Sequence, residues 1–320
     1  VQTEQFKRLG VIGDWDHPYM TLVPAYEATQ LEGFAEMVDK GLVYKGRKAI
    51  HWCIDCETAL AAAEIEYSDE VSPSIFVAYT YKDAAKVFPQ LEGRDVDIII
   101  WTTTPWTLPA SMAVAVHPRF DYGFYEVGEK VYLIAQGLKE KVIKATGLDL
   151  KEPIISCKGA DLELSKAMHP FYDKEVVVVL AEYVDLETGT GCVHTAPGHG
   201  NDDYETGVRY GIEVYNPVDD TGHYYPDTPL FAGMSLPDAE KMIFEMLTES
   251  GKLLGKEKLS HSYPHCWRCK KPVIFRATEQ WFVAVSDFRE EALKSIDEVR
   301  WIPDWGKERI TNMVRDRSDW

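Results

Sequence analysis

Two short segments carry the side chains of this chain that are best suited to chemistry. They are WTTTPWTLPA at residues 101–110 and GTGCVHTAPGHGNDDY at residues 189–204. Each is typical of a strand that runs into a loop, and together they supply hydroxyls, backbone N–H donors, imidazoles and carboxylates. Neither contains an obvious covalent nucleophile. This set of groups suits a pocket that holds a small amino-acid ester while water attacks it.

The first segment places Thr102, Thr103 and Thr104 at the exit of the strand-like run VDIIIW. Pro105 then ends regular pairing. Because β-branched threonine is common in strands, an ordinary strand end explains these residues equally well. As a functional site, three consecutive threonines would present hydroxyls on both faces beside free N–H groups, where they could bind a carboxylate-like or ribose-bearing ligand.

The second segment contributes an imidazole and two carboxylates. In an extended CVH stretch, Cys192 and His194 point to the same side. Asp202 and Asp203 then stand at the start of a helix, where the helix dipole accounts for one acidic residue. The other carboxylate would suit the ammonium group of an amino acid. The residue pattern leaves open which of the two has that role.

Two other catalytic arrangements can be drawn from the same residues. One is a Cys–His–Asp hydrolase of Cys192, His194 and Asp203, although i, i+2 geometry rarely aligns a base with its thiol. The other is a catalytic metal on His194, His199 and Asp203, which lacks an established ligand spacing. The chain contains no complete dinucleotide-binding fingerprint and no GxxxxGK[ST] phosphate loop.

Two CxxC pairs, Cys53 with Cys56 and Cys266 with Cys269, form the most specific chemical signal. Two such knuckles complete a tetrahedral four-sulfur site for Zn²⁺. Four sulfurs leave no position for water, so we expect a structural site that joins the strands entering and leaving an inserted domain. The alternatives are four unliganded cysteines or a redox pair, and neither CxxC lies in the βαβ context of thioredoxin-like proteins.

The elements that must position these groups are mostly short strands. Strand patterns cover residues 74–81, 96–103, 122–127, 130–135 and 175–184. We expect helices near 26–41, 138–146, from Asn201 or Asp202 onward, and at 237–250. Buried stripes are predicted from Tyr26, Phe34, Met37 and Val38; from Tyr204, Val208 and Ile212; and from Ile243, Phe244 and Leu247. The expected fold is α/β, mixed and strand-rich, with a closed or partly closed β-barrel and helical decorations.

Size and charge limit the function. With 320 residues, 45% hydrophobic and 27% charged, the chain is an ordinary globular protein of two or three domains. No apolar run reaches the roughly 20 residues of a membrane span, so we expect no membrane partner. The net charge of -18 argues against broad nucleic-acid binding but not against a module that meets the end of an RNA. Val1 and the uncapped helical pattern before Trp320 are expected of a piece of a longer protein.

Taken together, these motifs closely resemble the isoleucyl-tRNA synthetase family. WTTTPWTLPA, GTGCVHTAPGHGNDDY, HSYPHCWRC, FRATEQWF and WIPDWGKERI occur in the order in which that family carries them, over essentially the whole chain. In that family a large insertion, connective peptide 1, splits the catalytic domain and hydrolyses wrongly made valyl products. The valine and leucine enzymes have a similar insertion, but the sequences of their threonine loop and GTG loop differ.

The resemblance implies roles for individual residues. Thr102, Thr103 and Thr104 match the threonine-rich editing loop, His194 the histidine that lines the side-chain subsite, and Asp203 the aspartate that holds the substrate's ammonium group. The resemblance thus selects Asp203 over Asp202. Further candidate substrate contacts are Trp101, Thr107, Ser111, Gly198, His199 and Asp202. Ser111 departs from the asparagine common in the family.

The function implied is editing: hydrolysis of valine from tRNA(Ile), with valyl-adenylate as a further candidate substrate. The terminal ribose hydroxyl of the tRNA would help to activate the water. The alternative is a non-catalytic module that binds the tRNA acceptor end around a structural zinc site. Because neither a HIGH-type quartet nor a KMSKS-type loop is present, ATP-dependent ligation of isoleucine is expected of the parent enzyme only.

The resemblance also implies an organisation. Residues 1–45 would lead from the catalytic half, residues 46–67 and 259–285 would form a zinc-ribbon-like connector, and residues 68–258 the β-barrel-like editing domain. Residues 286–320 would return toward the catalytic domain. The expected partners are the 3′ acceptor end of tRNA(Ile), valine or valyl-adenylate, and the remainder of the synthetase, in the cytoplasm.

Overall fold

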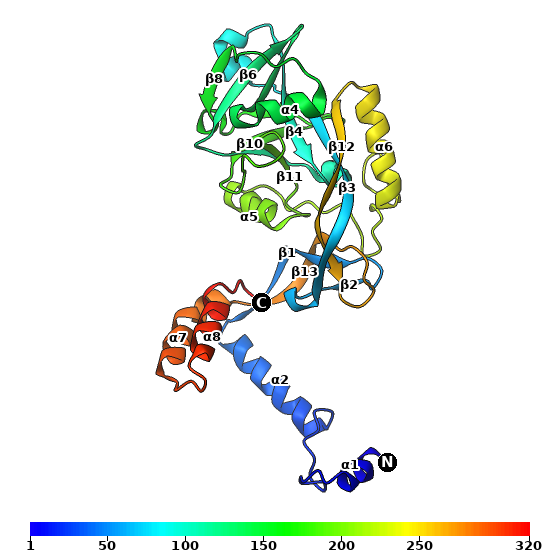
Figure 1. Ribbon diagram of the computed structural model, residues 1–320, viewed down its shortest axis with the longest axis vertical. Helices are drawn as coiled ribbons and strands as arrows, with labels where there is room; N and C mark the ends of the chain where they lie inside the picture. The colour runs from blue at the N-terminus through cyan, green and yellow to red at the C-terminus, as the bar shows by residue number, and fades with distance from the viewer. The chain divides into compact units, whose positions relative to one another are not determined.

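The protein, a computed structural model that describes residues 1–320, comprises two compact units. One unit combines residues 1–46 with residues 279–320, and the other is residues 47–278. The structure confirms the fold class, because strands and helices are mixed and strands predominate in the second unit (Figure 1). No helix has the length and apolar character that crossing a membrane requires. The four-part division expected from the sequence stays a prediction.

The first unit is built from helices. They are α1 (Gln2–Arg8), α2 (Pro24–Asp39), α7 (Val285–Glu298) and α8 (Trp305–Arg315), and α7 packs against α8. As expected, α2 ends just before Gly41, which takes a left-handed φ of 71°. Its predicted buried stripe is not observed, because α2 buries no residue and Phe34 and Val38 remain 45% and 46% exposed.

The second unit contains two main sheets. The six-stranded sheet has the order β12 (Leu253–Cys266), β3 (Ile65–Thr80), β4 (Asp95–Thr102), β7 (Lys130–Ala135), β6 (Asp121–Val127) and β8 (Ile155–Lys158). The four-stranded sheet has the order β11 (Cys192–Thr195), β5 (Ala113–Val116), β10 (Glu175–Leu180) and β9 (Lys166–Met168). The two sheets share no hydrogen-bonded ladder and meet where β4 contacts β11.

A third sheet has the order β13 (Ile274–Val283), β1 (Val43–Cys53) and β2 (Thr58–Ala59), and β1 and β13 run through both units. Helices α3 (Ala84–Val87), α4 (Lys139–Thr146), α5 (Asn201–Tyr210) and α6 (Leu236–Glu249) surround the sheets of the second unit. Among the short 3₁₀ turns, η3 (Pro105–Ala110) directly follows the threonine loop.

β4 shows why the threonine loop has a fixed position. Its Ile98, Ile99 and Ile100 are all fully buried, and Ile99 belongs to a different apolar cluster from the other two. A strand that is buried on both faces reads as a continuous apolar run. β4 pairs with β3 on one side and β7 on the other, so the packed core holds its exit at Thr102.

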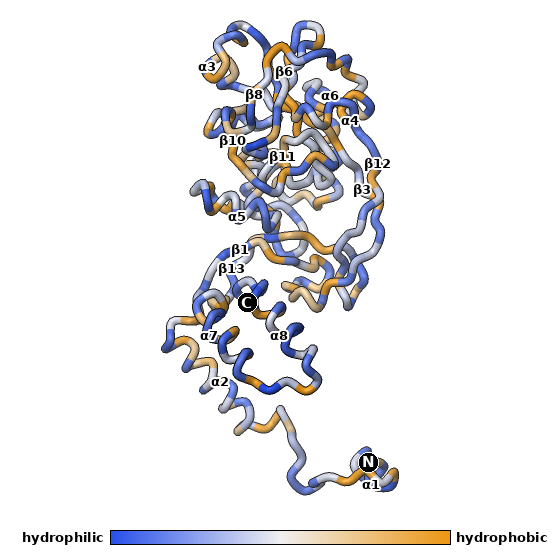
Figure 2. The backbone as a smooth tube through the Cα atoms, turned by 60° about the vertical axis from the view of Figure 1, so that its left-hand side comes forward, coloured by the Kyte–Doolittle hydropathy of each residue, from blue (hydrophilic) through white to orange (hydrophobic).

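The edge of the larger sheet is a long two-stranded ribbon made by β3 and β12. Hydrophilic and hydrophobic stretches follow one another along it (Figure 2), and β3 becomes fully buried only over residues 74–79. α6 packs against β12, and its Ile243 and Leu247 are fully buried as predicted (Figure 1). Ser235 caps α6 by accepting the N–H of Asp238.

Helix α5 departs from the sequence prediction at both its cap and its buried face. Gly200, in an extended conformation, is the N-cap, so neither Asn201 nor Asp202 caps the helix. The buried residues are Thr206 and Gly207 rather than the predicted stripe, since Val208 is 58% exposed. Gly207 lies so close to Pro197 that a Cβ would come within 2.8 Å of its ring. Because Gly207 packs against Pro197, the face of α5 that carries Gly207 is the buried one.

Candidate functional site

A cavity of about 290 Å³ lies where β4 and β11 meet. It is lined by residues of both segments singled out in the sequence: Trp101, Thr102, Thr103, Thr104, Thr107, His194, His199 and Asp203. The topology explains the meeting. After β4 the chain turns through η3 and enters the smaller sheet as β5, and β11 then pairs antiparallel with β5. His194 therefore lies beside the loop that leaves β4.

Three of the predicted contact residues do not line the cavity. Ser111 is fully buried and accepts a hydrogen bond from the hydroxyl of Tyr79. Gly198 approaches the backbone of Tyr215 so closely that a Cβ would lie 2.2 Å from its carbonyl oxygen. Asp202 is exposed in the first turn of α5. Contact of these three residues with a substrate stays a prediction.

Hydrogen bonds fix the tautomer of His194. Thr107 donates its hydroxyl hydrogen to the carbonyl oxygen of Thr104 at 2.8 Å, and its Oγ1 lies 3.1 Å from His194 Nε2. Since the threonine has only one hydroxyl hydrogen, His194 must be the donor, through Nε2–H. Nδ1 then carries a lone pair, and it is buried without a hydrogen-bond partner.

His199 is held in the opposite tautomer. Its Nδ1–H donates to the carbonyl oxygen of Phe275 at 3.0 Å, and the edge of Trp106 packs against its ring. Nε2 is buried without a partner and is left as an acceptor. Burial lowers the pKa of His194 and of His199 to about 4. The cavity is therefore lined by two neutral imidazoles, each with one unpaired nitrogen.

Asp203 supplies a carboxylate to the wall of the cavity. Its Oδ2 accepts the backbone N–H of Ala196 at 3.0 Å, and its Oδ1 accepts the hydroxyl of Tyr183 at 3.4 Å. Burial raises the pKa of Asp203 to about 7, although the bond from Ala196 acts against this. A cationic group in the cavity would favour the ionised carboxylate and recover the free energy lost by burying it.

Several lining residues were not predicted as site residues. They are Tyr183, Val184, Asp185, Thr188, Gly189, Thr190, Gly191 and Val193. Gly189 and Gly191 take left-handed φ values of 74° and 75°, which favour glycine. The GTG sequence was the signal for this turn. The sequence contained no comparable signal for Tyr183, whose place beside Asp203 is a tertiary contact.

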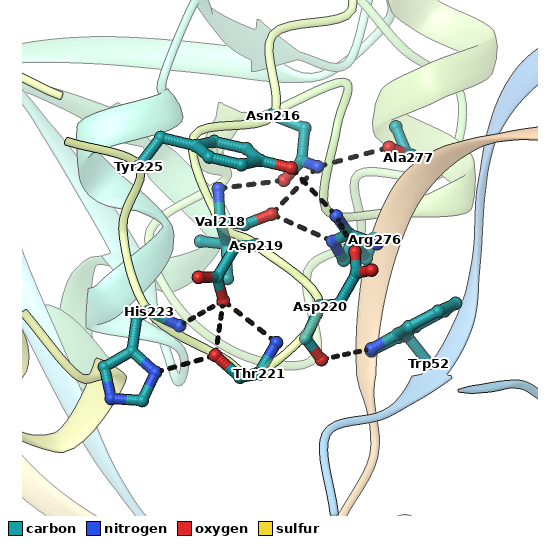
Figure 3. Close-up of polar contacts among 10 residues, drawn as sticks. All are labelled: Trp52, Asn216, Val218, Asp219, Asp220, Thr221, His223, Tyr225, Arg276 and Ala277. Carbon is teal, nitrogen blue, oxygen red and sulfur yellow. Dashed lines mark hydrogen bonds and ion pairs between the residues drawn. The ribbon is translucent and has the colours of Figure 1, made fainter. Parts of the chain in front are cut away.

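A polar network holds β13 beside this site (Figure 3). The buried guanidinium of Arg276 donates to the carbonyl oxygen of Val218 at 2.8 Å and pairs with Asp220 at 2.6 Å. Arg276 also donates to the hydroxyl of Tyr225 and lies over the ring of Trp52. Because Phe275 precedes Arg276 in β13, the network fixes the carbonyl that holds His199.

The four cysteines of the two CxxC pairs form one cluster. Cys53, Cys56, Cys266 and Cys269 place their sulfur atoms within 4.8 Å of one another. Burial opposes ionisation of Cys266, but the N–H groups of Cys269 and Arg268 more than offset it and lower its pKa to about 7. Two knuckles that converge in this way fit a single metal ion.

The two alternative catalytic arrangements find no support in the geometry. The thiol of Cys192 is fully buried, burial raises its pKa, and His194 directs its Nε2–H to Thr107. A thiol that stays protonated is a poor nucleophile. His194, His199 and Asp203 do not form a cluster of potential metal ligands, whereas the four cysteines do.

Comparisons with known protein families and with individual proteins agree on one family. The family of class I tRNA synthetases for isoleucine, leucine, methionine and valine (I, L, M and V) matches residues 1–320. The chain is 54% identical to the isoleucine–tRNA ligase of Thermoanaerobacter sp. (strain X514), covering 100% of this chain and 34% of that protein. It is 52% identical to the isoleucine–tRNA ligase of Syntrophomonas wolfei, again with 100% and 34% coverage. The chain thus spans about a third of the length of these relatives.

Two solved structures match part of this chain. The crystal structure of GlLeuRS-CP1 has a TM-score of 0.47 at 17% identity, covering 57% of this chain and 99% of that one. The editing domain of the P. knowlesi cytosolic leucyl-tRNA synthetase has a TM-score of 0.46 at 10% identity, covering 60% of this chain and 97% of that one.

Proposed function

Because the chain belongs to the class I tRNA synthetases of the isoleucine, leucine, methionine and valine group, we propose that its second unit is a hydrolytic editing domain. The proposed substrate is valine esterified to tRNA(Ile), with valyl-adenylate as a second substrate. The supporting observation is that Asp203, His194 and the three threonines all line one cavity. We propose that ligation of isoleucine with ATP belongs to the longer proteins of the family and not to this chain.

The physical need for such a site is clear. Valine is one methylene smaller than isoleucine, and an apolar pocket gains only about 1–3 kcal/mol from that group, isoleucine–tRNA ligases being themselves the standard example. A second pocket can exclude isoleucine by bulk. In the proposed arrangement the ring of His194, fixed by Thr107, sets the size limit for the side chain.

The reaction is hydrolysis of an ester. The oxygen of water bonds to the carbonyl carbon, the bond from that carbon to the ribose oxygen breaks, and the ribose oxygen takes up the proton. The products are valine and tRNA with a free terminal hydroxyl. Asp203 binds the ammonium group, and the hydroxyls and N–H groups of the threonine loop bind the carbonyl oxygen, whose negative charge grows in the transition state.

His199 and His194 take part as neutral groups. At neutral pH each imidazole keeps an unpaired nitrogen that can accept a hydrogen bond from water or from a ribose hydroxyl. We propose that the terminal ribose hydroxyl, rather than a protein base, helps to activate the water. Asp203 is committed to the ammonium group in this mechanism, and Asp185, the other carboxylate that lines the cavity, accepts the backbone N–H groups of Glu187 and Thr188.

The cysteine cluster is proposed to bind one structural Zn²⁺ through Cys53, Cys56, Cys266 and Cys269. The ion would supply only folding energy. The pairs lie on segments far apart in the sequence, so a metal would fix the entry and exit of the editing domain. The proposed partners are the 3′ acceptor end of tRNA(Ile) and the remainder of the synthetase, in the cytoplasm.

Deacylation of valyl-tRNA(Ile) by this chain tests the proposal, with isoleucyl-tRNA(Ile) as the competing substrate. We expect release of valine well above the uncatalysed rate and a loss of about 100-fold or more in Asp203→Ala. Glu205→Ala is the matched control, since this carboxylate of the same helix is exposed and does not line the cavity. No turnover, or equal turnover in both variants, would favour the non-catalytic tRNA-binding module instead.

A further inference from the structure

A second cavity of about 220 Å³ adjoins the candidate editing site. The two cavities share Trp101, Thr188 and Gly189 as lining residues. Gly189 lies so close to Trp101 that a Cβ would come within 3.1 Å of its side chain. The half-buried indole is therefore a wall common to both cavities.

Three lysines line this second cavity, and we name it the lysine groove after Lys141, Lys144 and Lys258. Lys141 and Lys144 stand three residues apart on α4 and so share a face of the helix. Lys258 approaches from β12. All three are exposed. Positive charge gathered on one surface is informative here, because the chain as a whole has a net charge of -18.

The ammonium groups of the three lysines form no ion pairs within the protein. Lys141 donates to the backbone carbonyl of Glu187 and forms no ion pair. Lys144 and Lys258 form neither an ion pair nor a side-chain hydrogen bond, although Glu187 and Glu257 also line the groove. Most other lysines of this unit with exposed ends are paired, as Lys86 is with Asp83. Unpaired ammonium groups in a concave surface are suited to an external anion.

We propose that the lysine groove binds the phosphodiester backbone of the RNA strand that carries the ester, with Trp101 offering a stacking surface for a base. This inference rests on the proposed function, because it takes the ester in the first cavity to be attached to an RNA end. Surfaces for single-stranded RNA combine cations that follow the phosphates with aromatic rings on which bases stack. The groove has both elements, directly beside the cavity that would hold the terminal ribose.

The first test is the salt dependence of RNA binding. The probe is a fluorescein-labelled single-stranded RNA with the 3′-terminal sequence of tRNA(Ile), titrated between 50 and 200 mM salt. Each lysine that neutralises a phosphate contributes about 0.7 to the slope of log K against log salt. We expect the double variant Lys144→Glu/Lys258→Glu to lower that slope by about 1.4. The control Lys86→Glu/Lys151→Glu makes the same charge change on exposed lysines outside both cavities and should leave the slope unchanged.

The second test compares two substrates. Valyl-adenosine has no phosphate, whereas valyl-tRNA(Ile) carries the whole strand. In the groove variant we expect the ratio of kcat/KM for valyl-tRNA to that for valyl-adenosine to fall about tenfold, with the thermal midpoint unchanged. An unchanged salt slope, or an equal loss in the control, would overturn the groove. If the unaltered chain hydrolyses neither substrate, the proposed function fails, and the RNA titration alone decides the groove.

Discussion

His194 Nε2 lies 3.1 Å from Thr107 Oγ1, and this contact joins the two segments that carry the candidate chemistry. Thr107 donates its hydroxyl hydrogen to the carbonyl oxygen of Thr104. The imidazole therefore donates to Thr107, and Thr107 donates to Thr104. A ring held in this way cannot turn to admit a larger ligand without breaking its hydrogen bond to Thr107. This rigidity suits a residue that is proposed to limit the size of a side chain.

Removal of the Asp203 charge should stabilise the protein in alkaline solution. The folded state raises the pKa of Asp203 from 3.8 to about 7, so between these values the folded protein keeps a proton that the unfolded chain has lost. The free energy of unfolding therefore decreases as pH rises from about 4 to about 7. We expect Asp203→Asn to be more stable at pH 8 by roughly 2–4 kcal/mol and equal at pH 3.5.

Urea unfolding at the two pH values measures this difference, with the exposed Glu205→Gln as the control. A gain of the same size at both pH values would contradict the burial of an ionised carboxylate, because it would not depend on titration.

The buried histidines should make the protein less stable in acid. Their effect on the free energy of unfolding has the opposite pH dependence to that of Asp203. His194 and His199 have pKa values of about 4 against 6.5 in the unfolded chain. As pH falls from about 6.5 to about 4, the unfolded chain takes up protons that the folded state refuses, and stability is lost. Each imidazole contributes up to about 3 kcal/mol. We expect the slope of unfolding free energy against pH to be shallower in His199→Gln and unchanged in the exposed His17→Gln.

Removal of the metal should loosen the second unit. A ligand that binds only the folded state at 100 times its Kd adds about 2.7 kcal/mol, which corresponds to roughly 5–10 °C in Tm for a unit of this size. We expect one zinc per chain by elemental analysis and this loss of Tm after chelation or in Cys266→Ser. Cys157→Ser, which replaces a half-buried thiol outside the cluster, should retain both the zinc and most of the Tm. Full retention of Tm after complete removal of zinc would contradict a structural metal.

Gly191 should tolerate no side chain. It combines a φ of 75° with a position at which a Cβ would lie 2.3 Å from the Cβ of Ala135. We expect Gly191→Ala to cost about 3 kcal/mol or more in unfolding free energy, from backbone strain and overpacking together. Gly211 has a similar φ of 64° but open space around it, so Gly211→Ala should cost about 1–2 kcal/mol, from strain alone. Equal costs in calorimetry would show that the contact with Ala135 relaxes freely.

The local sequence pattern was sufficient to predict the bounds of strands and helices that it determines without help from tertiary contacts. The apolar runs gave the strands β4, β6 and β7 nearly to the residue, and the stop at Gly41 gave the end of α2. The pattern was insufficient where packing against another segment decides the outcome. On α5 the buried face follows the contact of Gly207 with Pro197, which outweighs the periodicity of larger apolar residues. On α2 the predicted stripe stays exposed.

The sequence by itself determined the residue types of the candidate site, the CxxC pairs and the family, because these depend on the identity and order of residues along the chain. Only the tertiary structure decided that Tyr183 lies beside Asp203, which nitrogen of each histidine is free, and that three lysines gather beside Trp101. The reason is physical. A pKa, a tautomer or a shared wall depends on groups that approach through space from other strands, and no spacing along the chain encodes those distances.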